Sequence, residues 1–168
     1  MNEFDDLRVI SLRLLAAVAC GAILGVDRDI HGKPAGLRVL SLVSLGGAIV
    51  TLASLTLVAE TRGHVGDGVL RTVQGLLSGI GFLGAGVIMR SKDEDRVHGM
   101  TTAASVWLSS IMGITCGLGQ WKLAFMSFLL ALLTLLVGRR LENAIIRWGS
   151  QRTKKEKQSD KALEDPPH

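Results

Sequence analysis

Two short charged segments contain the residues whose types could do chemistry. In the first, Asp27 and Asp29 flank Arg28, and the second begins at Arg90 and reaches Thr102. Carboxylate oxygens are ligands for Mg²⁺, which keeps several of its own waters. Arginine and lysine side chains can bind an anion or a lipid headgroup. The candidate residues, named the rim cluster, are Asp27, Arg28, Asp29, Lys33, Arg38, Arg90, Thr101 and Thr102.

Three interpretations of the rim cluster stay open on the sequence alone. The charges can simply anchor the chain and form surface ion pairs, which contribute little stability. Arg28, Arg38 and Arg90 can instead form a site for an anion or a lipid headgroup. Asp27 and Asp29 are weak candidates for a magnesium site, because the spacing Asp-x-Asp is common; the metal ligands are therefore unknown.

The sequence contains no recognisable catalytic arrangement. It has no Ser-His-Asp order, no metalloprotease signature and no phosphate-binding loop. We therefore expect no enzyme and no cofactor, with Mg²⁺ entering only as a ligand or substrate.

Long uncharged runs separate the charged segments. Four of them approach the roughly 20 residues that cross a hydrocarbon core, and a fifth, residues 9–26, is interrupted only by Arg13. This pattern predicts an all-α, polytopic membrane helix bundle with five transmembrane helices. Their expected residues are about 9–26, 39–59, 71–89, 101–118 and 122–139.

The distribution of basic residues predicts how the helices cross the membrane. Fourteen of the 19 Lys and Arg residues fall on one side of the five spans, which places that side in the cytoplasm. Residues 1–8 then form a periplasmic N-terminus, residues 9–140 the transmembrane domain, and residues 141–168 a basic, partly disordered cytoplasmic tail. The acidic start MNEFDDLR is unlike a signal peptide, so the first helix is expected to be retained.

The stretch SGIGFLGAGVIM, residues 78–89, matches the glycine spacing of a dinucleotide-binding fingerprint. That fingerprint follows a buried strand and requires an acidic residue about 20 positions later. Here the glycines lie within an expected membrane span, and position 99 is glycine. The spacing therefore indicates helix packing, since small residues let helices approach closely in a bilayer; a bend or gate is the alternative.

Small residues at a spacing of four recur in two other spans. Because the span 71–89 has glycines on two faces, we expect it in the middle of the bundle, packed with the spans 9–26 and 101–118. The bulky span 122–139 is expected to face lipid. The predicted packing residues are Ala17, Gly21, Gly25, Gly75, Gly79, Gly81, Gly84, Gly86, Ser109, Gly113 and Gly117.

Five ordered motifs between about Leu14 and Arg140 resemble the membrane domain of the MgtC/SapB family. They read GVDRD, KPAGLR, QGLLSGIGFLGAGVIMR, GMTTAASVW and GITCGLG. The positions of the family's motifs that match here are Arg28, Asp29, Ala35, Gly36, Leu37, Arg38, Gly79, Gly81, Phe82, Gly84, Ala85, Gly86, Arg90, Gly99, Thr101, Thr102 and Ala103.

This resemblance implies a bacterial inner-membrane protein of magnesium or ion homeostasis that transports or senses Mg²⁺. The alternative is a non-transporting regulator that binds another membrane complex such as an ATPase. The expected partners are the lipid bilayer and either a second copy or another inner-membrane protein, with no nucleic acid.

Two departures from the family pattern bear on these expectations. The usual L-E-R-E reads Val26-Asp27-Arg28-Asp29 here, which shortens both acidic side chains. Virulence-associated members also carry a folded domain after the last span, where this chain has a short charged tail.

Overall fold

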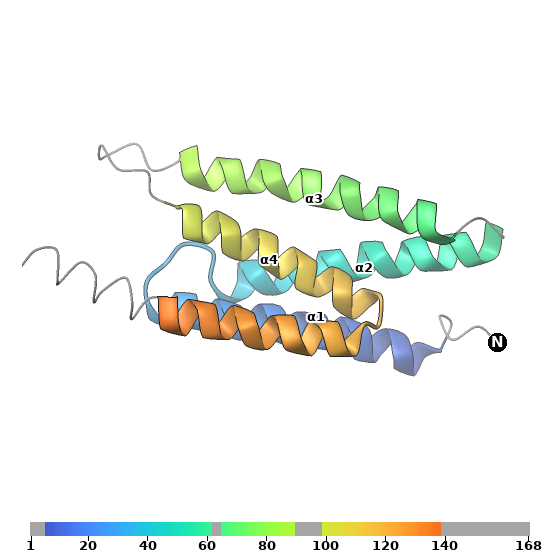
Figure 1. Ribbon diagram of the computed structural model, residues 1–168, viewed down its shortest axis with the longest axis horizontal. Coiled ribbons are helices and arrows are strands. Elements are labelled where there is room, and N and C mark those ends of the chain that lie inside the picture. The colour runs from blue at the N-terminus through green and yellow to red at the C-terminus, as the bar shows by residue number, and fades with distance from the viewer. Residues whose placement is uncertain (1–5, 62–64, 90–98, 139–168) are drawn as a thin grey trace, which may run out of the picture. The chain divides into compact units, whose positions relative to one another are not determined.

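A computed structural model describes residues 6–61, 65–89 and 99–138. These residues form helices and no strand, which confirms the predicted all-α class. Figure 1 labels α1 (Leu7–Ile30), α2 (Leu37–Thr61), α3 (Val65–Met89) and α4 (Met100–Gly117), and a further helix spans Trp121–Gly138. The chain divides into two compact units, Met1–Phe128 and Leu129–His168. The helices α1 to α4 belong to the first unit, and the expected tail 141–168 lies outside the described residues.

Four of the described helices are long and apolar enough to cross a membrane: Leu7–Ile30, Leu37–Ala59, Asp67–Ile88 and Trp121–Gly138. The helix α4, expected to be the fourth span, is not among them, because serine and threonine lower its hydropathy. Ser105 and Ser109 are buried within the protein, and both hydroxyls donate hydrogen bonds to backbone carbonyls. A helix enclosed by other helices can carry hydroxyl groups, since they find hydrogen-bond partners there.

Helix α1 continues to Ile30, four residues beyond its expected end. Gly32 ends it in the left-handed conformation, at a φ of 59°, which costs glycine little. The Lys33 N–H then bonds the Arg28 carbonyl and the Gly32 N–H bonds the Asp29 carbonyl, a glycine-dependent helix end. Asp27, Arg28 and Asp29 therefore lie on a helix and not in the loop where the sequence placed them.

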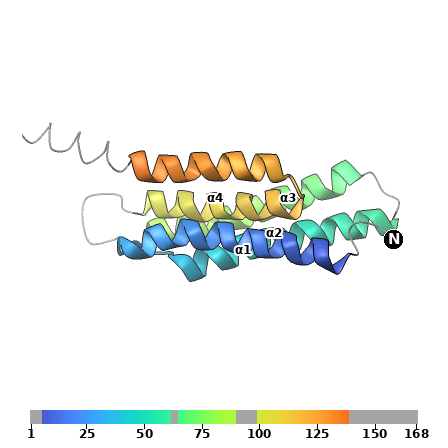
Figure 2. The same ribbon diagram turned by 90° about the horizontal axis from the view of Figure 1, so that it is seen from below.

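The centre of the bundle is formed by α2 and α4. Figure 1 shows this pair between α1 and α3, and Figure 2 shows the same helices from below; both α1 and α3 contact each member of the pair. A Cβ added at Gly21 of α1 would lie 2.5 Å from the Leu40 carbonyl oxygen of α2. One added at Gly113 of α4 would lie 1.9 Å from the Ser44 carbonyl oxygen. Glycines on α1 and α4 thus bring both helices against the α2 backbone.

Serine hydroxyl groups bond across these close approaches. Ser44 of α2 donates to the Ala17 carbonyl of α1 at 2.7 Å, and Ser109 of α4 donates to the Leu40 carbonyl of α2 at 2.7 Å. Both hydroxyls are fully buried. A carbonyl oxygen that accepts a helical bond has a second lone pair for a hydroxyl, and small residues let the helices come close enough for this second bond.

The prediction that the span 71–89 lies in the middle of the bundle is wrong for the single chain. Four of its glycines, Gly75, Gly79, Gly81 and Gly86, have open space where a Cβ would be. Among the glycines of this span, only Gly84 faces a neighbour: a Cβ added there would lie 3.4 Å from the Ala103 Cβ of α4. A glycine pattern marks faces that can be approached, but it does not say which neighbour approaches them.

The helix Trp121–Gly138 begins within the first unit. There Leu123, Phe125 and Met126 are exposed, whereas Ala124 joins a buried cluster with Ala17, Ala48 and Cys116. One small residue of this helix therefore faces the core while its bulky neighbours face outward.

Candidate functional site

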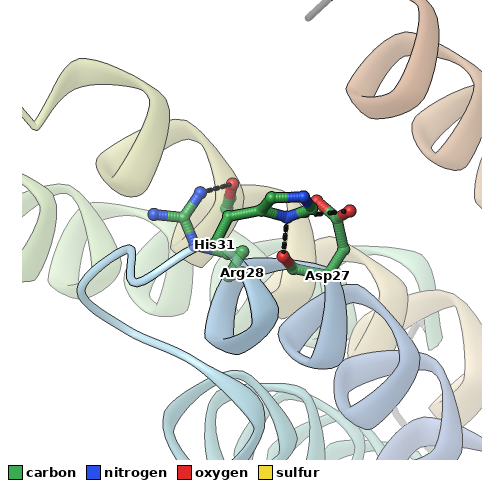
Figure 3. A network of polar contacts seen from close by, with 4 residues as sticks. Asp27, Arg28 and His31 are labelled. Carbon is green, nitrogen blue, oxygen red and sulfur yellow. Dashed lines mark hydrogen bonds and ion pairs between the residues drawn. The ribbon is translucent and has the colours of Figure 1, made fainter.

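The rim cluster lies where α1 ends and where α2 and α4 begin. We call this end of the bundle the rim. Asp27, Arg28 and Asp29 occupy the last turns of α1, and Thr101 and Thr102 lie in the first turn of α4. Figure 3 shows the Arg28 guanidinium together with Asp27 and His31. That the rim faces the cytoplasm stays a prediction from the distribution of charges.

Arg28 is the centre of the rim, and only 4% of its surface is exposed. Its Nε donates to the Ala35 carbonyl at 3.1 Å, and one terminal nitrogen donates to the Pro34 carbonyl at 2.9 Å. These bonds hold the turn that precedes α2. The remaining bonds reach α4: one to the Thr102 hydroxyl at 2.5 Å, one to the Ser105 hydroxyl at 2.9 Å and a longer one to the Thr101 carbonyl at 3.4 Å.

The five N–H donors of a guanidinium thus have five acceptors, all of them neutral oxygens. Among the residues that the structure describes, no carboxylate lies within ion-pair distance of Arg28. A buried charge is tolerated only when its hydrogen bonds are satisfied, and this network satisfies them. In this conformation Arg28 has no donor left for an external anion, and it joins α1, the turn and α4.

Asp29 caps the first turn of α2. One oxygen of its carboxylate accepts the Leu37 N–H at 2.8 Å, at the first residue of α2. The first N–H groups of a helix lack partners within the helix, and a nearby carboxylate also favours their positive dipole end. A Cβ at Gly36 would collide with this carboxylate, which explains glycine at the residue before α2.

Asp27 turns towards His31, one turn later on α1. The Nδ1 atom of His31 lies 3.4 Å from the Asp27 carboxylate and also close to the Asp27 carbonyl. Residues two apart on a helix do not face each other, so Asp27 and Asp29 point to different sides of α1. The pair therefore does not fit a site in which both bind one Mg²⁺ ion. The described residues contain no cluster of three His, Cys, Asp or Glu side chains that could hold a metal.

The side chains of Lys33 and Arg38 take no part in the Arg28 network. Arg38 and Lys33 are exposed, and Arg90 lies outside the described residues. Thr101 contributes its carbonyl and not its exposed side chain. Arg28 cannot contribute to the expected anion site of Arg28, Arg38 and Arg90, because it is buried and all of its N–H donors are bonded within the protein.

Two residues that form hydrogen bonds between α1 and α4, Ser105 and Arg13, were absent from the predicted rim cluster. Ser105 completes the Arg28 network, and its spacing of four from Ser109 was the available signal. Arg13, at the other end of α1, donates to the Gly117 carbonyl at 3.0 Å, where a cation is favoured at the end of α4. Its spacing of four from Ala17 placed it on the packed face. The two arginines therefore hold α1 against both ends of the antiparallel α4.

The cap at α2 gives a first testable prediction. Replacing Asp29 with alanine is expected to lower the free energy of unfolding by about 1 kcal/mol, the usual cost of losing a helix-capping oxygen. Asp29→Asn keeps an oxygen acceptor and should cost less, and Asp27→Ala serves as the matched carboxylate control. Thermal unfolding in a mild detergent measures all three. Equal losses for Asp27→Ala and Asp29→Ala would contradict the capping role.

A family model described as the MgtC family matches residues 14–144. The protein SrpB of Synechococcus elongatus is 36% identical over 145 residues, which cover 83% of this chain and 79% of SrpB. MgtC of Salmonella typhimurium is 41% identical over 121 residues, which cover 72% of this chain and 48% of MgtC. The Escherichia coli protein called "Putative magnesium transporter YhiD" is 36% identical over 131 residues, covering 76% and 59%. No solved structure matches the chain.

The matched region contains the whole α1–α4 bundle from Leu14 onward, including both residues that hold the rim together, Arg28 and Asp29. The chain spans about half the length of MgtC and more than half that of YhiD. Several apolar helices of membrane-spanning length accompany the match, so this is a multi-pass membrane protein. The chain belongs to the MgtC family.

Proposed function

We propose that this protein acts in magnesium homeostasis in the bacterial inner membrane. Its family membership supports a magnesium-related membrane protein, as does its 36% identity with a protein whose name refers to magnesium transport. The excess of Lys and Arg at one side of its spans supports an inner-membrane location with a cytoplasmic C-terminus.

Within this role, we propose that the protein modulates another membrane protein and does not itself carry Mg²⁺. The supporting observation is that two charged residues of the rim, Arg28 and Asp29, are engaged in holding helices together. The Arg28 donors bind neutral oxygens of the turn and α4, and the Asp29 carboxylate binds the first N–H of α2. The proposal includes no catalysis and no resident cofactor.

Transport of Mg²⁺ is the second candidate. The name of YhiD favours it, and that protein aligns with 76% of this chain. The two carboxylates at the end of α1 then supply the first oxygens that an ion meets at the rim, with Asp27 the more available because its partner is a histidine.

Two measurements on the full-length chain separate these candidates. The first is growth at limiting magnesium of a bacterial strain that lacks its own MgtC-family protein, with and without the gene for this chain. The second is Mg²⁺ uptake into liposomes that contain the purified protein, compared with empty liposomes and with protein carrying Asp27→Asn. We expect growth to be restored and uptake to equal that of empty liposomes.

The combination of results decides between the candidates. Restored growth without uptake supports the regulator. Saturable uptake that disappears with Asp27→Asn would replace it with a transporter that uses the rim. Failure to restore growth, by a chain shown to be folded and membrane-inserted, would overturn the magnesium role itself.

A further inference from the structure

The outward face of α3 carries a row of polar and small residues that no part of α1, α2 or α4 covers. In α3, 6% of the most apolar window is buried, against 28% in α2. Figure 1 shows α2 and α4 on one side of α3 only. The opposite side carries six exposed residues, which we call the α3 seam: Asp67, Arg71, Gln74, Ser78, Gly81 and Ala85.

The spacing of the α3 seam is that of a helix-pairing surface. Its members follow one another at intervals of four, three, four, three and four residues. This repeat of about 3.5 residues keeps one stripe facing a partner helix along a left-handed pair. The inner contacts of α3, through Ile80 and Gly84, lie on the other side of the helix.

Two polar side chains of the α3 seam, Gln74 and Ser78, would be unfavourable if they faced lipid. Gln74 and Ser78 lie about 10 and 16 Å along the membrane-spanning stretch that begins at Asp67, within the hydrocarbon core. Neither side chain has a hydrogen bond to another residue in the described part of the chain. An amide and a hydroxyl in hydrocarbon without partners are costly, whereas a facing helix can satisfy them.

We propose that the α3 seam is the interface of a parallel homodimer in the membrane, in which α3 packs against α3 of a second copy. Copies of one chain insert in the same orientation, so a parallel pair with a twofold axis along the bilayer normal is directly available. In that pair each Gln74 faces its counterpart and each Ser78 faces its counterpart, and every one of these groups can donate and accept. Gly81 and Ala85 let the two backbones approach closely.

Charge complementarity favours a second copy over an unrelated partner. Asp67 and Arg71 occupy adjacent positions of the α3 seam, where it leaves the hydrocarbon. In a parallel pair, an Arg71 side chain reaches the Asp67 carboxylate of the other copy, because neighbouring layers interlock. Because of the twofold axis, this ion pair occurs twice in the dimer. The α3 seam thus supplies its own complement in charge, hydrogen bonding and shape.

Cysteine cross-linking of the full chain in its membrane tests the pairing. In a background with Cys20→Ala and Cys116→Ala, the variant Ser78→Cys is compared with Leu83→Cys, which is also exposed but about 140° away around α3. With an oxidising catalyst we expect about fivefold more disulfide-linked dimer from Ser78→Cys than from Leu83→Cys. Equal yields, a larger yield at Leu83→Cys, or cross-links only to a different protein would overturn the proposal.

A second measurement keeps the native cysteines. Single-molecule counting of the labelled protein in liposomes over a range of dilutions gives the dimer dissociation constant. Gln74→Leu removes the central polar pair from an exposed position, so folding should be unaffected, and we expect the dissociation constant to rise about tenfold. A protein that is monomeric at all dilutions, or a dimer that Gln74→Leu leaves unchanged, would contradict the α3 interface.

Discussion

Replacing Arg28 with methionine is expected to lower the free energy of unfolding by about 3 kcal/mol, since a buried group that loses its partners is among the costliest changes. Methionine fills part of the space but leaves the buried Thr102 and Ser105 hydroxyls without their donor. Arg28→Lys should cost about 2 kcal/mol, because an ammonium cannot reproduce a planar fork of five donors. Unfolding of the purified protein in mixed detergent micelles measures both.

Arg38 provides the control for this experiment. It carries the same charge at the start of α2 but is exposed, so Arg38→Met should change stability by less than about 0.5 kcal/mol. A double-mutant cycle with Ser105→Ala isolates the contact itself, for which a coupling of about 1 kcal/mol is expected. Equal losses for Arg28→Met and Arg38→Met, or a coupling near zero, would show that the rim network does not hold α1 to α4.

The second large effect is expected at the contact of α2 with α4. Gly113→Ala should destabilise the protein by about 3 kcal/mol, at the upper end of the cost of inserting a methyl group into a packed core. The new Cβ would lie 1.9 Å from the Ser44 carbonyl oxygen, and backbone cannot move aside as a flexible side chain can. The helices must separate, which also strains the bond from Ser109 to the Leu40 carbonyl. The same detergent unfolding measures this loss.

Gly46 of α2 is the matched control, because nothing lies within 4 Å of the position its Cβ would take. There alanine is expected to leave stability unchanged or raise it by up to about 1 kcal/mol, because alanine favours a helix more than glycine does. The adjacent Gly47, whose Cβ would lie 2.7 Å from the Ser110 carbonyl oxygen, should respond as Gly113 does. If Gly46→Ala and Gly113→Ala cost the same, close helix approach is not the reason for the glycine.

These two effects act on the same three helices. The Arg28 network ties α1 and the turn before α2 to the start of α4, and the glycine contacts hold both helices against α2. The α3 seam lies outside this core. Changes at the seam should therefore alter association without altering the stability of α1, α2 and α4, so that the interface proposal and the core predictions can be tested separately.

The sequence by itself determined the features that depend on neighbouring residues along the chain. Uncharged runs of membrane-spanning length predicted five helices, and five helices form in the described residues. Spacings of four between small residues indicated the packed faces of the first and fourth helices, where Gly21 and Gly113 do contact α2. Such local patterns can be predicted from the sequence because helix geometry places residues four apart on one face.

Only the tertiary structure decided which faces meet and what the charged residues do. The glycines of α3 and α4 look alike in sequence, yet those of α4 contact α2 and most of those of α3 contact nothing. Arg28, Arg38 and Asp29 are all charged residues at one rim, but α1 continues four residues past its expected end, where Arg28 is buried and the Asp29 carboxylate bonds to α2. A periodic pattern specifies the direction in which a side chain points, whereas burial and bonding depend on which distant segment lies there, and that is set by packing across the whole bundle.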